Sequence, residues 1–236
     1  MSKVFITFGA GNDDYYAAVK RLTTQVENLQ LFDRIIGYTD ANLRKDSKFW
    51  PQHQEFITAN KRGYGYWLWK PYLILKTLSK MEEGDVLLYA DCGCEISTSK
   101  KTEINGLLQD VNEDLLYASY ADTEIVWSKI DLISYFRQRY QISNVDLNSR
   151  QFQASTIMCK KCPLVMKIVN KWYKLACNYH FLDDSSSLLT NNPSFREHRH
   201  DQSIFSLLCK NYKLYGKKSL ASPINIARNK TGISKI

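Results

Sequence analysis

An acidic residue directly follows a strongly apolar run in the middle of the chain. Residues 85–90 read Asp-Val-Leu-Leu-Tyr-Ala, and residues 91–95 read Asp-Cys-Gly-Cys-Glu. In open α/β sheets, ligands bind outside the carboxyl ends of the strands. A carboxylate at such an end can hold a hard cation, because Mg²⁺ or Mn²⁺ takes one or two carboxylates together with phosphate oxygens and water. Asp91 is therefore a candidate ligand for a cation or a substrate, and the alternative is an aspartate that only makes a turn.

Aromatic residues and a lysine stand just before that run. Residues 62–71 read Arg-Gly-Tyr-Gly-Tyr-Trp-Leu-Trp-Lys-Pro. Proline is tolerated only in the first turn of a helix, so the helix expected up to residue 81 begins near Lys70. A helix N-terminus and a cation both favour phosphate, and the aromatic rings offer flat faces for a base or a sugar. The alternative is that Trp67 and Trp69 belong to the core.

Both β-strands and α-helices are predicted around these residues. Apolar runs alternate with amphipathic stretches along the chain, which is typical of α/β folds. Strands are predicted at 3–8, 34–39, 85–90, 115–119 and 154–159, and 49–57 is interpreted as irregular or a short strand. Helices are predicted after a cap at Asn12 or Asp13 and at 70–81, 102–109, 129–140, 163–179 and 201–212. We predict one α/β domain over 1–220, with a mostly parallel sheet covered by helices on both faces, and a basic tail over 221–236.

The positive charge of the protein is concentrated at one end. The 236 residues carry a net charge of +8, and the segment from Gln202 to Ile236 contains seven Lys or Arg and no acidic residue. The rest of the chain is therefore nearly neutral. This asymmetry argues against a basic nucleic-acid-binding fold and for a single basic segment, so no nucleic-acid partner is expected.

Composition also suggests a compartment. No stretch approaches the roughly 18 apolar residues of a transmembrane helix, and the N-terminus lacks the features of a signal peptide. We therefore expect a cytoplasmic protein whose six cysteines are thiols. The pairs Cys92 with Cys94 and Cys159 with Cys162 could form a zinc site, but buried thiols are the better interpretation.

The order of helix, short turn, apolar strand and Tyr-x-Asp resembles the centre of the GT-A nucleotide-sugar glycosyltransferases. It is similar to the retaining glycogenin-like and mannosyltransferase-like families. In that resemblance Asp91 matches the first Asp of an Asp-x-Asp motif and Lys70 the cationic residue near the donor. Gly93 stands where the second Asp would be. The resemblance implies Mn²⁺ or Mg²⁺ as cofactor, with Asp91, Glu95 and His198 as candidate ligands.

Other segments agree with this resemblance. Residues 151–159 stand in place of the strand that faces the donor sugar and acceptor, and residues 198–203 resemble the Asp-Gln element near the anomeric carbon. They make Gln153, Asp201 and Gln202 the candidate catalytic residues, and Asp201 also suits a helix N-cap. The first strand ends where this fold holds the base. The candidate donor-binding residues are Thr7, Phe8, Gly9, Arg62, Tyr66, Lys70, Asp91 and Gly93.

The reaction that the resemblance implies is glycosyl transfer from a nucleoside diphosphate sugar to a hydroxyl of a glycan or lipid-linked acceptor, in glycan or polysaccharide synthesis. Its transition state is oxocarbenium-like, and negative charge on the departing diphosphate must be stabilised. The Asp-Gln element favours a retaining hexosyltransferase. The basic tail then has two candidate tasks, which are to fold over the diphosphate or to hold the enzyme at anionic lipids as a peripheral membrane contact.

Two other functions remain open at this point. A nucleotidyltransferase would also bind a sugar nucleotide, but its glycine-rich phosphate loop would be reduced to Gly9-Ala10-Gly11. The same short motif gives little support to a dinucleotide site. A non-catalytic sugar- or nucleotide-binding module would use the aromatic residues without turnover, so donor binding without transfer distinguishes it from an enzyme.

Overall fold

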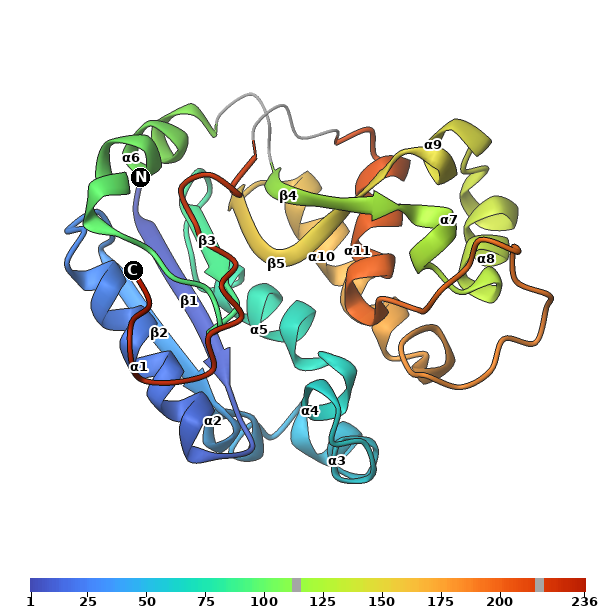
Figure 1. Ribbon diagram of the computed structural model, residues 1–236, viewed down its shortest axis with the longest axis horizontal. Coiled ribbons are helices and arrows are strands. Elements are labelled where there is room, and N and C mark those ends of the chain that lie inside the picture. Colours follow the sequence, from blue (N-terminus) through green and yellow to red (C-terminus); the bar gives the residue numbers. More distant parts are fainter. Residues whose placement is uncertain (112–115, 215–218) are drawn as a thin grey trace.

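The computed structural model describes residues 1–111, 116–214 and 219–236, with the backbone alone for 116–120. Its sheet has five strands in the order β2-β1-β3-β5-β4 (Figure 1). β1 pairs in parallel with β2 and β3, whereas β5 pairs antiparallel with β3 and β4. Four strands therefore share one direction, and the predicted mostly parallel α/β sheet is confirmed. The strands are β1 (Lys3–Gly9), β2 (Arg34–Thr39), β3 (Val86–Ala90), β4 (Leu116–Thr123) and β5 (Arg150–Lys160).

Helices cover both faces of this sheet. The α-helices are α1 (Asp13–Glu27), α2 (Asp40–Arg44), α3 (Trp50–Ala59), α4 (Gly63–Tyr66), α5 (Trp69–Leu78), α6 (Lys101–Asp110), α7 (Glu124–Trp127), α8 (Ile130–Tyr140), α9 (Asn144–Asn148), α10 (Pro163–Ala176) and α11 (His200–Asn211). Two short 3-10 helices are η1 (Thr98–Lys100) and η2 (Tyr179–Phe181). Within the described ranges, no helix is long and apolar enough to cross a membrane.

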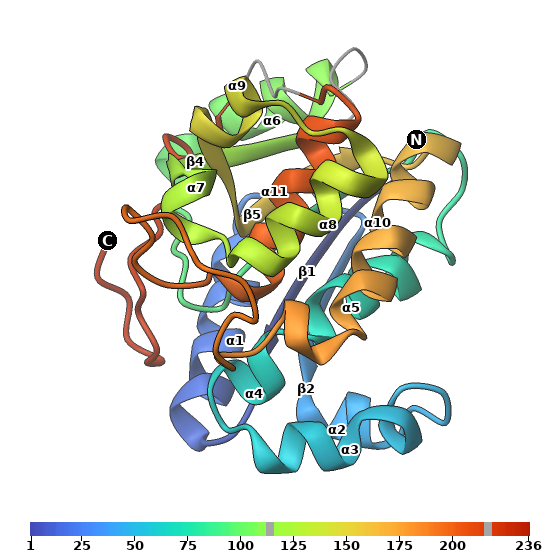
Figure 2. The same cartoon turned by 90° about the vertical axis from the view of Figure 1, so that its right-hand side faces the viewer.

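The core lies in two layers because side chains alternate along each strand. On β1, Val4 and Ile6 pack into the larger cluster, with α5, α8, α10 and α11. Phe5 between them faces the other cluster, where Leu22 of α1 and Ile104 of α6 cover the sheet. Figure 2 shows α5 and α10 side by side on the first of these faces. Burial of both faces explains why the strands read as continuous apolar runs.

Most predicted elements are confirmed, including the N-cap of α1. The side chain of Asn12 accepts a hydrogen bond from the Tyr15 amide at 3.1 Å. The interpretation of 49–57 as irregular or a strand is wrong, because these residues lie in α3. Pro51 occupies the first turn of that helix, where a missing amide hydrogen has no cost, and His53 and Ile57 share its buried face. Residue 115 of the fourth predicted strand lies outside the described residues.

Residues 221–236, expected as a tail, form a C-terminal segment that returns to the body of the domain. Ile224 of this segment is buried in the cluster that contains α1 and α6, as is Leu220 just before it. Asn225 then forms two backbone hydrogen bonds with Glu95, just after β3, at 2.8 and 2.9 Å. Further along, Ser234 accepts a hydrogen bond from Gln25 of α1 at 3.1 Å. Figure 1 shows this segment crossing the carboxyl ends of the central strands, with the C-terminus near α1.

Candidate active site

A cleft of about 1020 Å³ opens at the carboxyl ends of β1 and β3. Its walls are completed by the N-terminal end of α11, by residues 63–67 with their left-handed backbone before α5, and by part of the C-terminal segment. This is the edge at which open α/β sheets bind ligands, because the strand ends and helix N-termini converge there. Among the expected donor and catalytic residues, those that line it are Phe8, Gly9, Arg62, Lys70, Asp91, Gly93, Asp201 and Gln202.

Lys70 joins two carboxylates at the floor of the cleft. Its ammonium Nζ lies 3.1 Å from Asp91 Oδ1 and 3.3 Å from Asp201 Oδ2, and it donates to the Ala154 carbonyl at 3.1 Å. Burial lowers the pKa of Lys70, but the charges of Asp201 and Asp91 outweigh burial and raise that pKa above its ordinary value. Lys70 is therefore a protonated cation held at a fixed position.

Asp201 differs from Asp91 in its exposure to solvent. The Asp201 side chain is 5% exposed, and that of Asp91 is 33% exposed. Burial raises the pKa of Asp201 to about 7 against the opposing charge of Lys70. Asp201 lies inside the first turn of α11, after the cap residue Arg199, so it is not the N-cap. Its carboxyl group faces Lys70 and exchanges its proton near neutral pH.

Gln202 connects the cleft to a buried polar network that sequence reasoning missed. Its Oε1 accepts from the Ala154 amide at 3.3 Å, and its Nε2 donates to Gln151 Oε1. Gln151 in turn donates to Glu124 at 2.9 Å, and Glu124 forms an ion pair of 3.0 Å with Lys210. These contacts fix the side-chain amide of Gln202 beside the cleft.

Aromatic rings form one wall of the cleft. Phe8 stacks on Trp69 with ring centroids 3.9 Å apart, and Trp67 stacks on His200 at 5.3 Å. Trp69 is 5% exposed and belongs to the core, whereas Trp67 is only partly buried. The two alternatives from the sequence, core and site, are therefore not exclusive, because both tryptophans line the cleft and both contact the core cluster. Burial lowers the pKa of His200 to about 4, so its ring is neutral.

The backbone before α5 is left-handed over five consecutive residues. The φ angles from Gly63 to Trp67 run 58°, 53°, 82°, 50° and 62°. Glycine adopts this conformation freely, but it costs roughly 1–2 kcal/mol at each of Tyr64, Tyr66 and Trp67. Such strain concentrates at functional sites. Here it turns the chain so that Tyr64 and Trp67 line the cleft while Gly65 packs against Ile57 of α3.

The rim of the cleft is strongly basic. Among the described residues, its lining includes seven Lys or Arg side chains and two acidic ones. Arg62 pairs with Asp184 at 2.8 Å. By contrast, within the described ranges Arg228 and Lys230 form no ion pair. The excess of cations over acids fits an anionic ligand.

Five expected site residues lie outside the cleft lining. Thr7 is buried in β1 below it, and Gln153 is half-buried on β5 between Gln151 and Ser155. Ser155 itself lines the cleft, and the two-residue alternation along β5 could have identified it. Tyr66 packs on the His200 ring with centroids 5.0 Å apart.

The other two residues outside the cleft lining are the expected metal ligands Glu95 and His198. Glu95 is 1% exposed and accepts hydrogen bonds from Asn229, Ser234 and the Lys235 amide. His198 accepts from the Lys129 amide at 3.2 Å and donates to the Phe181 carbonyl at 2.8 Å. Burial lowers the pKa of His198 to about 3, so it is a neutral structural residue.

The expected set of ligands for Mn²⁺ or Mg²⁺ is therefore not assembled. In the described part of the chain, no group of three His, Cys, Asp or Glu side chains is placed to hold a metal ion. Asp91 accepts from both Lys70 and Tyr89. At the position of the second Asp, a Cβ on Gly93 would lie 3.3 Å from Arg228 Cα. These residues do not fit a divalent cation held by two carboxylates, and the cysteines are free thiols.

Fold and site together define an α/β protein with a basic, aromatic-lined cleft at the carboxyl ends of its strands. No family model matches the sequence, and no curated protein matches it either. Several solved structures that are similar to this chain are glycosyltransferases. Mouse xyloside xylosyltransferase 1, in its apo form, is 12% identical, with a TM-score of 0.47 over 91% of this chain and 83% of that chain.

Two further similar structures have the same general description. The galactosyltransferase LgtC, solved with donor and acceptor sugar analogs, is 15% identical, with a TM-score of 0.42 over 98% of this chain and 84% of that chain. The glycosyltransferase GlyE of Streptococcus pneumoniae is 14% identical, with a TM-score of 0.44 over 93% of this chain and 45% of that chain. At these identities and TM-scores the likenesses carry no functional argument, so the function is inferred from the cleft.

Proposed function

We propose that the protein is a glycosyltransferase that moves a hexose from a nucleoside diphosphate sugar to a hydroxyl of a glycan or lipid-linked acceptor. One observation carries the proposal: a buried lysine fixes two carboxylates at the floor of a cleft whose walls are aromatic and basic. A sugar nucleotide has three parts that need these three environments. Its base needs a flat apolar face, its diphosphate needs cations, and its sugar hydroxyls need acceptors.

The proposed donor pose follows from where these environments lie. Tyr15 and Phe8 stand at the end of β1, where the base would pack. Arg228 and Lys230 lie beside Gly93, where the diphosphate would pass. Asp91 is one-third exposed and can accept a hydrogen bond from a sugar hydroxyl while it remains paired with Lys70.

We further propose that transfer retains the anomeric configuration. An inverting enzyme needs a base beside the acceptor hydroxyl. Asp91 and Asp201, the two acidic side chains in the described lining, are both paired with Lys70, and Asp201, whose pKa is about 7, is only 5% exposed, so we assign neither as that base. In the retaining reaction the bond between the anomeric carbon and the phosphate oxygen breaks, and the acceptor oxygen bonds to the same face. The acceptor proton passes to the departing diphosphate. Gln202, fixed by Gln151 and Ala154, would stand beside the anomeric carbon.

The test is donor turnover by the purified protein. A panel of nucleoside diphosphate sugars is screened by thermal shift, because a ligand stabilises the state that it binds, and the best binder is then assayed for hydrolysis and transfer. We expect Asp91→Ala to lose activity by at least about 100-fold with its fold intact, and Glu83→Ala, an exposed acid in the turn before β3, to retain it.

Three results would contradict this proposal. Unchanged activity in Asp91→Ala would remove the assigned role of that carboxylate. Binding of a sugar nucleotide without any turnover would favour the non-catalytic binding module. An inverted anomeric proton in the NMR spectrum of the product would exclude retention while leaving glycosyl transfer in place.

A further inference from the structure

We propose that Arg228 and Lys230 of the C-terminal segment neutralise the donor diphosphate, in the place that a divalent cation takes in a site with two carboxylates. The inference rests on the proposed function, because it assigns the partner of the diphosphate in that same cleft. Two monovalent cations would supply the same formal charge as one Mn²⁺. Four features of the described residues carry the inference.

The first feature is the space at position 93. A Cβ on Gly93 would lie 3.3 Å from Arg228 Cα and 3.4 Å from the Arg228 carbonyl carbon, both of them backbone atoms. The Asn229 amide also donates to the Gly93 carbonyl at 2.9 Å. The C-terminal segment thus packs on the position where the second carboxylate of an Asp-x-Asp motif would stand. A side chain at position 93 would therefore be in tight contact with the backbone of the segment, which would have to shift by a few tenths of an ångström to accommodate it.

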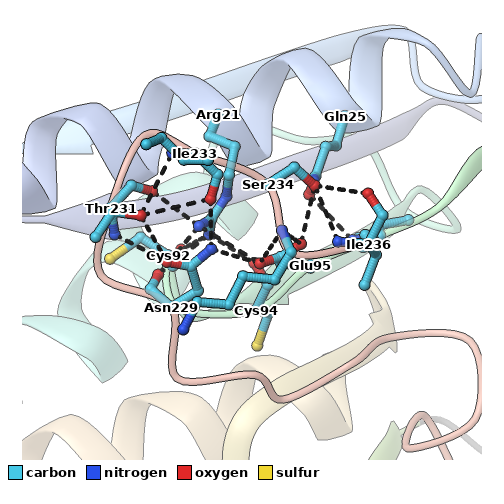
Figure 3. A network of polar contacts seen from close by, with 12 residues as sticks. Arg21, Gln25, Cys92, Cys94, Glu95, Asn229, Thr231, Ile233, Ser234 and Ile236 are labelled. Carbon is cyan, nitrogen blue, oxygen red and sulfur yellow. Dashed lines mark hydrogen bonds and ion pairs between the residues drawn. The ribbon is translucent and has the colours of Figure 1, made fainter.

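The second feature is a buried network that fixes the segment, and Figure 3 shows its members. We call Arg21, Glu95 and Asn229 the latch. The guanidinium of Arg21 donates to the carbonyls of Cys92 and Cys94, at 2.7 and 2.9 Å, and to that of Asn229 at 3.2 Å. Asn229 in turn donates to Glu95. The latch thus joins α1, the loop after β3 and the C-terminal segment.

The third feature is the direction of the side chains around the latch. Asn229 is 1% exposed, whereas its neighbours Arg228 and Lys230 are exposed and line the cleft. Arg228 has a φ of 51°, a left-handed conformation that costs roughly 1–2 kcal/mol outside glycine. The latch holds the chain in this conformation, and both cations stay at the cleft.

The fourth feature is the availability of charge. Lys70 is already matched by Asp91 and Asp201, at 3.1 and 3.3 Å. Arg228 and Lys230 form no ion pair within the described ranges, and Lys230 Nζ lies 5.5 Å from the centre of the Tyr15 ring. Arginine and lysine are the side chains that bind phosphate oxygens most strongly. Among the cations of the described lining, Arg44, Arg62, Lys70 and Arg199 each have a carboxylate partner, whereas Lys61, Arg228 and Lys230 have none. Two of these three unpaired cations are on the C-terminal segment.

The test measures binding of UDP and GDP by isothermal titration calorimetry, in buffer with EDTA and again with added Mn²⁺. We expect wild-type protein to bind one of them in EDTA, with an affinity that Mn²⁺ changes by less than about threefold. The double variant Arg228→Ala/Lys230→Ala should lose roughly 100-fold, because each charge-assisted contact is worth tenfold or more. The charge-preserving variant Arg228→Lys/Lys230→Arg should stay within about tenfold of wild type.

Lys235→Ala is the matched control. It removes one charge from the same segment, and the contact of residue 235 with Glu95 is made by the backbone amide. It should bind like wild type. Binding that requires Mn²⁺, or a double variant that binds like Lys235→Ala, would overturn the inference while leaving the proposed function intact. Failure of wild-type protein to bind either nucleotide or any sugar nucleotide, with or without Mn²⁺, would instead reject the proposed function.

Discussion

Asp91 and Glu95 lie four residues apart on the loop after β3, and each is paired with a buried cation of another element. Glu95 faces Arg21, and its remaining acceptor positions are filled by Asn229, Ser234 and the Lys235 amide. Its side chain is 0% exposed, whereas that of Asp91 is 33% exposed beside Lys70. A carboxylate with all its partners inside the protein stabilises a structure, and one that also faces solvent can accept a ligand.

Electrostatics separates the two sites further. Burial raises the pKa of Glu95, but hydrogen bonds from Asn229 and the Lys235 amide outweigh it, so that pKa lies below its ordinary value. In the cleft, burial raises the pKa of Asp201 to about 7. Glu95 is therefore ionised at neutral pH, while Asp201 in the cleft can still exchange a proton. The same kinds of side chain thus serve stability in one place and chemistry in the other.

The largest effect on stability is expected from Arg21→Met. This change leaves Glu95 as a buried carboxylate without its cation and deprives the carbonyls of Cys92 and Cys94 of a donor. Breaking a buried pair by removing one partner costs about 3–5 kcal/mol. Urea unfolding followed by circular dichroism measures this loss. Lys20→Met, at the exposed neighbouring position, is the control, and equal unfolding free energies for the two variants would show that the latch is not structural.

Lys70→Met should reduce stability less than Arg21→Met does, but it should greatly reduce donor turnover. Asp91 is partly solvated, and Asp201 can accept a proton because its pKa is already about 7. The loss in unfolding free energy should therefore be smaller, about 1–3 kcal/mol. Donor turnover should fall by at least about 100-fold, since the two carboxylates lose their common cation. Lys80→Met, at an exposed turn position two residues after α5 ends, should change neither quantity. A Lys70→Met protein that turns over donor at the wild-type rate would break the proposed distinction between the sites.

The smallest effect is a difference in pH dependence. Asp201 has a raised pKa, so its carboxylate, which we expect to accept a sugar hydroxyl, forms as pH rises through about 7. Donor affinity should increase by a few-fold over that interval, and Asp201→Asn should remove the increase.

Glu95 has a lowered pKa, so its contribution to stability is complete above its unfolded pKa of roughly 4.3 and is lost as pH falls through the folded value. Between about pH 6 and 8, the free energy of unfolding measured with urea should therefore have the same pH dependence in wild-type protein and in Glu95→Gln.

Local patterns were sufficient for most of the fold. Continuous apolar runs identified β1, β2 and β3, and Pro71 placed the start of α5 within one residue, since a proline fits only the first turn. The same rule applied to Pro51 would have identified α3. Its aromatic and β-branched residues, which are typical of strands, outweighed that signal in the sequence interpretation. The direction of β5 had no local signal at all, because antiparallel pairing with β3 depends on where the chain returns.

The site was predictable where strand ends and helix starts define it. Lys70, Asp91, Asp201 and Gln202 all line the cleft, although they come from three separate parts of the chain. Glu95 and His198 were expected beside Asp91 because they lie near motif residues in sequence. Neighbouring side chains after a strand end can face opposite sides of a loop, and spacing alone does not tell which side a carboxylate faces.

The sequence by itself determined an α/β domain and a strand followed by Asp91. It also determined a lysine in the first turn of the helix that precedes this strand, and a basic C-terminal segment without acidic residues. Each of these features depends only on residues that are close together in the sequence: an apolar run, a proline position or a cluster of charges. Only the tertiary structure decided that the C-terminal segment packs on Gly93 and that Glu95 belongs to the latch. Both depend on contacts between residues more than 130 positions apart, as in the bond from Asn229 to Glu95 with a separation of 134. Such contacts form only when a whole chain has folded, because each is stabilised by the burial of all its neighbours.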